Sequence, residues 1–230
     1  MLVLKKANYG GYKATNLQHK IEERLEKKLN VDIMKEPSVT LVLEPITRVN
    51  EQLDKGQYFF SDVIKEGILL YDSGEYTLSP VREEIPWKER RTIAQEEYED
   101  WFESGAEFLA LTASAFEKMM LKKAAFLLHQ ATESFYNAIL LVFTGYKPKT
   151  HDILELAKKA RNYHNNLFMI FPTETQEQED CFTLLKDAYI KARYDKHYKI
   201  SKEQMLYLIS RVEKLKAVTE KICLEKLVKK

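Results

Sequence analysis

The sequence predicts a mostly helical α+β protein, in which a small, partial α/β segment precedes an up-and-down bundle of about five helices. Two observations lead to this class. Nine glycines and prolines fall in residues 1–86 and four follow Pro86, so turns are concentrated in the first segment. Beyond residue 92, apolar side chains recur at spacings of three and four, the period of a helix with one buried face. We therefore expect two domains, residues 1–86 and residues 92–228.

The first segment mixes helical patterns with short apolar runs. Residues 39–43 are β-branched and aliphatic, which favours a strand. Ile46, Val49 and Leu53 recur at helical spacing, and Gly56 ends that helix. In chain order, the predicted elements are a helix over 16–29, a strand over 39–43, helices over 46–55 and 58–66, and a strand over 68–71 that runs into a turn at 72–74.

The second segment predicts five amphipathic helices after a charged linker at 82–91. In chain order they cover residues 98–112, 120–142, 152–163, 182–192 and 201–222. Thr150 is the expected N-cap of the third helix. Ser201-Lys-Glu-Gln204 has the spacing of a capping box and is expected to open the fifth.

Composition limits the classes of partner. The formal charge is +1, from 36 basic and 35 acidic side chains, so an RNA-binding surface would be a local patch. No apolar run approaches the ~20 residues of a membrane span, and the start lacks the charge order of a signal peptide. Cys181 and Cys223 match no zinc spacing, and residues 92–230 show no cluster with metal-ligand spacing. We expect a cytoplasmic protein without membrane partner, metal or cofactor.

Arg193 and His197 are the first candidate pair for chemistry. They are four residues apart, so on a continuous helix they would lie on one face. An arginine can hold a phosphate while a histidine moves protons, which makes the pair a candidate catalytic site. The alternative is that Arg193 pairs with a carboxylate and His197 lies on a solvated helix end.

A second group is a candidate for nucleotide or phosphate binding. Lys147, Lys149 and His151 precede the third predicted helix, whose N-terminus would attract an anion. His129 lies beside the apolar stripe of the second helix. The alternatives are that His151 only begins a helix and that His129 is a buried histidine with satisfied hydrogen bonds.

Three sequence segments together resemble HEPN domains: His129-Gln-Ala-Thr-Glu133, Lys147-Pro-Lys-Thr-His-Asp152 and Ala188-Tyr-Ile-Lys-Ala-Arg-Tyr194. The resemblance covers residues 95–225 and implies a HEPN-like helical bundle. It also implies a homodimer associated with a nucleotide or RNA, in a toxin–antitoxin or stress/defence system with a partner protein from a neighbouring gene.

Many HEPN proteins are metal-independent ribonucleases in which four to six residues separate an arginine from a histidine. Only three residues separate Arg193 from His197, so this chain departs from that spacing. Three functions stay open: a nucleotide- or RNA-associated protein, a ribonuclease using Arg193 and His197, and a structural dimerisation module.

Residues 56–62 and 65–74 resemble the C-terminal part of minimal nucleotidyltransferase domains fused to HEPN domains. Such domains hold Mg²⁺ and a triphosphate with a Gly-Ser turn and an Asp-x-Asp strand. Neither motif occurs in the sequence. Residues 1–4 resemble the tail of the Asp-x-Asp strand, so we expect the chain to begin just after the metal-binding aspartates. Met1 would then be an internal methionine or the start of a decayed gene, and the segment would lack nucleotidyltransferase activity.

Overall fold

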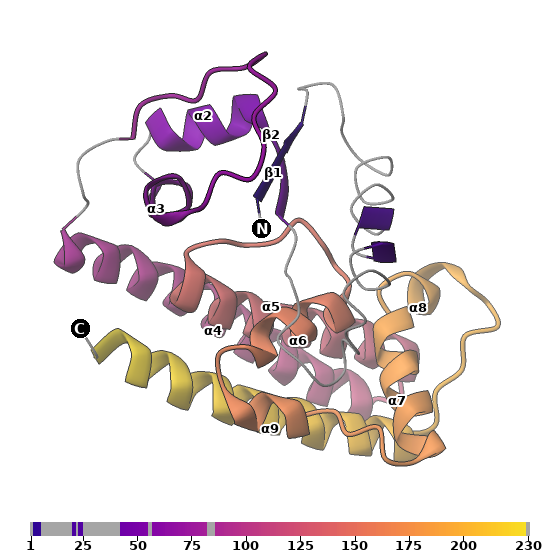
Figure 1. The fold of residues 1–230 in the computed structure, drawn as a ribbon. Coiled ribbons are helices and arrows are strands. Elements are labelled where there is room, and N and C mark those ends of the chain that lie inside the picture. Colours follow the sequence, from indigo (N-terminus) through magenta and orange to yellow (C-terminus); the bar gives the residue numbers. More distant parts are fainter. Residues whose placement is uncertain are drawn as a thin grey trace. The chain divides into compact units, whose positions relative to one another are not determined.

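A computed structural model describes residues 2–5, 20–21, 23–24, 42–54, 57–81 and 86–228. The chain divides into two units, Met1–Pro86 and Trp87–Lys230 (Figure 1).

Among its described residues, the first unit contains a parallel strand pair followed by the helices α2 and α3. Strand β1 (Leu2–Lys5) pairs with β2 (Val42–Pro45), with Leu2 opposite Val42. Helices α2 (Ile46–Asp54) and α3 (Tyr58–Glu66) follow, which confirms both predicted helices. Ile46, Val49 and Leu53 are buried because their spacing places them on one face of α2.

The strand predicted at residues 68–71 is wrong. These residues have no regular secondary structure and are 76–86% exposed. In the part of the chain that the structure describes, the sheet contains β1 and β2, and residues 68–71 pair with neither. An apolar run forms a strand only where a neighbouring strand takes its backbone hydrogen bonds.

The turn at 72–74 is confirmed, because the Gly74 N–H donates to Asp72 Oδ1 at 2.9 Å and Gly74 has a φ of 69°. The predicted helix over 16–29 is described only at residues 20–21 and 23–24, which are helical. Of the strand predicted at 39–43, residues 39–41 lie outside the described residues, and 42–43 belong to β2.

The second unit is a helical bundle built around α5. Its elements are α4 (Trp87–Glu117), α5 (Leu121–Thr144), α6 (Ile153–Arg161), the 3₁₀ helix η1 (Asn165–Met169), α7 (Gln176–Asp187), α8 (Lys191–Tyr194) and α9 (Lys202–Val228). The long helices α4, α5 and α9 pack on one another, and α6, α7 and α8 also contact α5 (Figure 1). Every residue from 131 to 142 is therefore buried.

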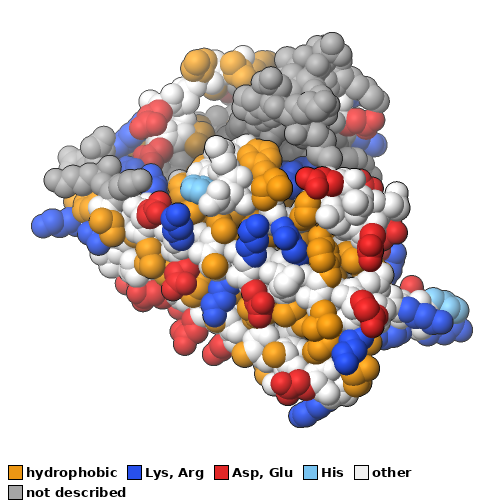
Figure 2. Space-filling view, turned by 90° about the horizontal axis from the view of Figure 1, so that it is seen from below, with side chains coloured by type: hydrophobic (Ala, Val, Ile, Leu, Met, Phe, Trp, Pro, Cys, Tyr) orange, Lys and Arg blue, Asp and Glu red, His pale blue; other side chains and the backbone are white. Residues whose placement is uncertain are grey.

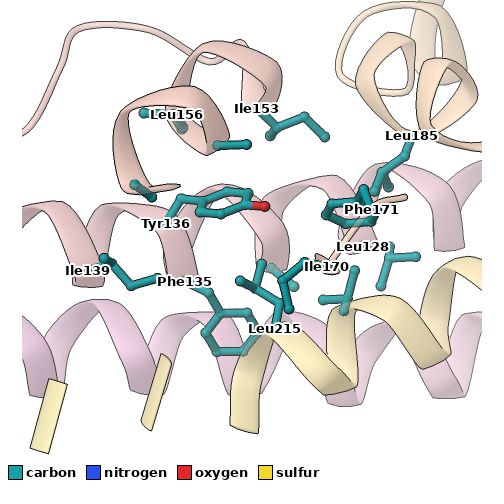
Figure 3. Close-up of a cluster of buried hydrophobic side chains, with 14 of the residues drawn as sticks. Leu128, Phe135, Tyr136, Ile139, Ile153, Leu156, Ile170, Phe171, Leu185 and Leu215 are labelled. Carbon is teal, nitrogen blue, oxygen red and sulfur yellow. The ribbon is translucent and has the colours of Figure 1, made fainter. Parts of the chain in front are cut away.

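The core lies on both sides of α5. Figure 3 shows Tyr136 beneath α6, beside Ile153 and Leu156, and Phe135 on the other side of the helix near Leu215. Gly105 of α4 allows this approach: a Cβ at that position would lie 2.7 Å from Phe135 Cε1. Small residues let helix backbones approach closely, so Gly105 is required by packing rather than by a turn.

Two boundaries differ from prediction. Helix α4 begins at Trp87, so residues 87–91 are helical and not linker, while 82–85 lie outside the described residues. Lys, Arg and Glu are good helix formers, so the charge run extends the helix. The predicted fourth helix is divided into α7 and α8. The Leu184 carbonyl, in the last turn of α7, accepts a hydrogen bond from the Tyr198 hydroxyl at 3.0 Å.

The caps explain where the helices start and stop. Asp152, not Thr150, is the N-cap of α6, because its Oδ1 accepts the Leu154 N–H at 2.9 Å. The capping box at Ser201 is confirmed, since the Gln204 N–H donates to Ser201 Oγ and the Ser201 N–H donates to Gln204 Oε1. Gly145 ends α5 with a φ of 65°.

Candidate functional site

Arg193 projects from α8 into a group of aromatic rings. Its guanidinium carbon lies 4.7 Å from the ring centroids of Phe126 and Tyr189, and 5.0 Å from that of Tyr194. Its Nε–H donates to the Tyr189 carbonyl at 2.7 Å. Among the residues that the structure describes, no carboxylate lies within ion-pair distance of Arg193. The alternative in which Arg193 pairs with a carboxylate is therefore wrong for the described residues.

His197 does not share a helical face with Arg193. Helix α8 ends at Tyr194, and His197 lies exposed in the segment that follows. Its backbone N–H donates to Asp195 Oδ1 at 2.7 Å, a local turn that is incompatible with continuing the helix. The expected alignment fails because the helix stops too early, and a catalytic role for His197 stays a prediction.

His151 is oriented by a buried carboxylate. Its Nδ1 lies 2.9 and 3.1 Å from the two carboxylate oxygens of Glu133 on α5. The His151 side chain is 58% exposed and that of Glu133 is 7% exposed. The ring also stacks on Tyr189, with centroids 4.6 Å apart and planes at 17°. With Nδ1–H donating to the carboxylate, Nε2 of the neutral ring is left with its lone pair.

We refer to Phe126, Glu133, His151, Tyr189 and Arg193 as the Tyr189 cluster. Tyr189 lies between α7 and α8. Its ring contacts Phe126 of α5, His151 in the segment before α6, and Arg193 of α8, so it joins these three parts of the chain. Sequence reasoning missed Tyr189 and Phe126. The four-residue spacing of Tyr189 and Arg193 was one available signal, because such residues are neighbours along a helical chain.

His129 lies fully buried behind this cluster. Its Nδ1 is 3.0 Å from the Leu185 carbonyl and its Nε2 is 3.1 Å from the His151 carbonyl. Burial lowers the pKa of His129, against the opposing effects of the two carbonyls and of Glu133. The neutral ring has one N–H and donates to one carbonyl at a time. The position fits a satisfied core histidine that ties α5 to α7.

Of the two predicted lysines, Lys147 contacts a ring of α4. Lys147 Nζ lies 4.9 Å from the centroid of the Trp101 ring on α4, and Lys149 is exposed. At the start of α6, the Leu154 N–H already donates to the Asp152 carboxylate, which weakens the case for a phosphate there. Phosphate binding by Lys147, Lys149, His151 and His129 as one site stays a prediction.

The chain around α8 is locally basic and aromatic. Residues 186–202 contain six lysines and arginines against two aspartates, with tyrosines at 189, 194 and 198. Lys122 of α5 fastens the loop after α8, since its Nζ donates to the carbonyls of Asp195 and Lys196. On the face drawn in Figure 2, basic and acidic side chains are interspersed, so any nucleic-acid surface on that face is local.

Among the described residues, no group of three or more His, Cys, Asp or Glu side chains is arranged to hold a metal ion. No helix within the described ranges is long and apolar enough to cross a membrane.

The fold and site define a helical-bundle protein with an exposed arginine and an oriented histidine at one aromatic cluster. The sequence pattern of the HEPN domain matches residues 98–222, more than half of the chain, so the chain belongs to the HEPN family. HEPN domains are generally associated with RNA binding and ribonuclease roles in defence and toxin–antitoxin systems. No curated protein matches the chain. The HEPN match does not reach residues 1–86, whose nucleotidyltransferase likeness stays a prediction.

Proposed function

We propose that this chain is a HEPN-type, nucleotide- or RNA-associated protein that binds phosphate-bearing ligands at the Tyr189 cluster. The observation that carries the proposal is Arg193, whose guanidinium is packed among aromatic rings with no carboxylate partner among the described residues. The Nε–H of Arg193 is used by the Tyr189 carbonyl, and the terminal N–H donors of the exposed guanidinium are left for an external anion.

The chemistry of the ligand follows from the side chains. A guanidinium can donate two parallel hydrogen bonds to one phosphate, and it does so more strongly than a neutral donor. Aromatic rings beside a cation are suited to single-stranded nucleic acid, because bases stack on rings while cations follow the backbone. The basic excess of residues 186–202 supports the same ligand.

A homodimer belongs to the proposal, as does a role in a toxin–antitoxin or stress/defence system with a partner protein from a neighbouring gene. The HEPN membership supports both. Sedimentation at tens of micromolar chain tests the first, and a monomer would contradict it. The runner-up, a structural dimerisation module, predicts a dimer without affinity for nucleotides or RNA.

Residues 1–86 are proposed to be nucleotidyltransferase-like and inactive. The given sequence contains no Gly-Ser turn followed by Asp-x-Asp, and in such domains these motifs hold Mg²⁺ and the triphosphate. Incubation of the chain with labelled ATP and Mg²⁺ tests this, and incorporation of label into protein or RNA would contradict it.

A titration of fluorescent single-stranded RNA with the whole chain tests the main proposal. We expect a dissociation constant of about 1–100 μM at physiological salt, weakening as salt rises because phosphate contacts release counterions. Calorimetry with ATP and GTP tests the nucleotide alternative. Absence of binding to both RNA and nucleotides, with a folded dimer present, would support the dimerisation module instead.

A further inference from the structure

We infer that the turn between α4 and α5 is a docking surface for an acidic, partly apolar segment of a partner protein, and that Met119 and Met120 are its apolar contacts. Neither methionine belongs to the Tyr189 cluster, and docking at this turn does not depend on the proposed binding of RNA.

Met119 occupies a position at which the backbone favours glycine. Helix α4 ends in a Schellman motif, because the Met120 N–H donates to the Ala115 carbonyl and the Met119 N–H to the Phe116 carbonyl, both at 2.9 Å. Met119 accordingly has a φ of 57°, in the left-handed region. Glycine adopts this conformation without the steric cost that a Cβ brings. A methionine at this position therefore lowers stability.

Met120 departs from a second local preference. It is the N-cap of α5, and its side chain makes no capping hydrogen bond. Ser, Thr, Asp and Asn are favoured at an N-cap, because their side-chain oxygens accept an N–H of the first helical turn. Two neighbouring residues thus differ from those that the turn itself requires. Such departures are expected where a residue serves function rather than folding.

Both methionines are exposed to solvent. Met119 is 58% exposed and Met120 is 38% exposed, so burial in the bundle core does not explain either residue. Methionine is flexible and polarisable, which lets it pack against apolar partners of different shapes. Contact with a partner accounts for both the exposure and the local cost in stability.

The charge around the turn selects the kind of partner. Residues 118–123 contain three lysines and no acidic side chain. Lys122 also holds the loop after α8 beside the turn, since its Nζ donates to the carbonyls of residues 195–196. That loop belongs to the segment 186–202, with six lysines and arginines against two aspartates. A partner that carries Asp and Glu beside its apolar side chains complements this surface.

Other occupants fit the surface less well. A second copy of the chain that met this turn about a two-fold axis would place lysines against lysines. Single-stranded nucleic acid is bound by cations together with rings on which bases stack, and the two methionines supply no ring. An anionic lipid surface would attract the lysines but would also meet the exposed side chain of Glu117, which a peptide can avoid.

Peptides selected from a phage-displayed random library on the full chain are the probe. They should be enriched in Asp and Glu together with Leu, Ile or Phe, and their affinity is measured by fluorescence polarisation. Met119→Gly combined with Met120→Ser should weaken this affinity about tenfold or more, as the loss of an interface hot spot does. The melting temperature should stay the same or rise, because both substitutions suit the turn.

A second pair of substitutions tests charge and leaves the methionines in place. Lys118→Glu combined with Lys123→Glu reverses two exposed charges and should also weaken the binding of acidic peptides about tenfold or more. Met169→Ala is the matched control, because Met169 of η1 is 53% exposed. Its affinity for the peptides should stay within about twofold of the wild type.

A selection that yields no acidic, apolar peptides would overturn the inference, as would peptides whose affinity is unchanged in both double variants. Binding to vesicles of phosphatidylserine and phosphatidylcholine that the methionine variant loses, without peptide binding, would assign the turn to lipid instead. Single-stranded RNA should bind the methionine variant like the wild type, and an equal loss of RNA affinity would also overturn the inference. A chain that binds peptides in the expected way but neither RNA nor nucleotides would overturn the proposed function alone.

Discussion

Helices α5 and α8 contribute to the same cluster but differ in nearly every physical respect. Helix α5 has 24 residues and is buried throughout 131–142, whereas α8 has four residues and none of them is buried. Burial of apolar surface is the main source of folding free energy, so α5 should determine stability. Arg193 on α8 is exposed and should determine binding. Stability and function are therefore expected to respond to different substitutions.

The largest effect is expected at Phe135 of α5. Phe135→Ala removes a fully buried ring and should lower the free energy of unfolding by about 3–5 kcal/mol. Urea unfolding followed by circular dichroism measures this. Phe168→Ala, which removes a half-exposed ring from η1, is the control and should cost less than about 1 kcal/mol. Equal costs for the two variants would contradict the comparison.

Gly105 of α4 tests the packing on the other side of Phe135. Alanine is the better helix former by about 1 kcal/mol, yet its Cβ would lie 2.7 Å from Phe135 Cε1. We expect overpacking to prevail, because the ring is enclosed, and the unfolding free energy to fall by about 1–2 kcal/mol. Ser114→Ala, at an exposed position of the same helix, should be neutral or slightly stabilising. A stabilised Gly105→Ala variant would show that the ring can move aside.

The pH dependence of stability tests the buried histidine behind the cluster. Burial lowers the pKa of His129 in the folded chain below its ordinary 6.5, which the unfolded chain keeps. At a pH between the folded and the unfolded pKa, the unfolded chain therefore binds the proton more readily. The stability contributed by neutral His129 is thus present above about pH 6.5 and is lost as the pH falls toward the folded-state pKa. Urea unfolding between pH 5 and 7.5 should give a smaller pH dependence for His129→Gln than for the wild type. Parallel curves would indicate an unshifted histidine.

Periodicity in the sequence was enough to predict the bundle and its long helices, because apolar side chains at helical spacing indicate both a helix and the face that it buries. It could not predict the division of the fourth helix into α7, which ends at Asp187, and α8, which begins at Lys191. It also placed a strand at 68–71, because an apolar run does not reveal whether a pairing partner exists.

The candidate site was predicted only in part, because its contacts join residues that are distant in the sequence. Arg193, His151 and His129 were named from the sequence, but the pairing of His151 with Glu133 joins residues that 18 positions separate. Such a contact depends on the path of the segment between α5 and α6. The sequence pattern instead favoured Arg193 with His197, which a continuous helix would have aligned.

The most direct test of the account compares two cations on α8. Lys191 is paired with Asp187 at 2.7 Å, whereas Arg193 has no carboxylate partner among the described residues, so Lys191→Gln and Arg193→Gln remove the same charge from different settings. The measurement is the dissociation constant for single-stranded RNA at one salt concentration. We predict that Arg193→Gln weakens binding about tenfold and Lys191→Gln less than about threefold, with unchanged melting temperatures. Equal losses for the two variants, or none for Arg193→Gln, would contradict the assignment of the Tyr189 cluster as the binding site.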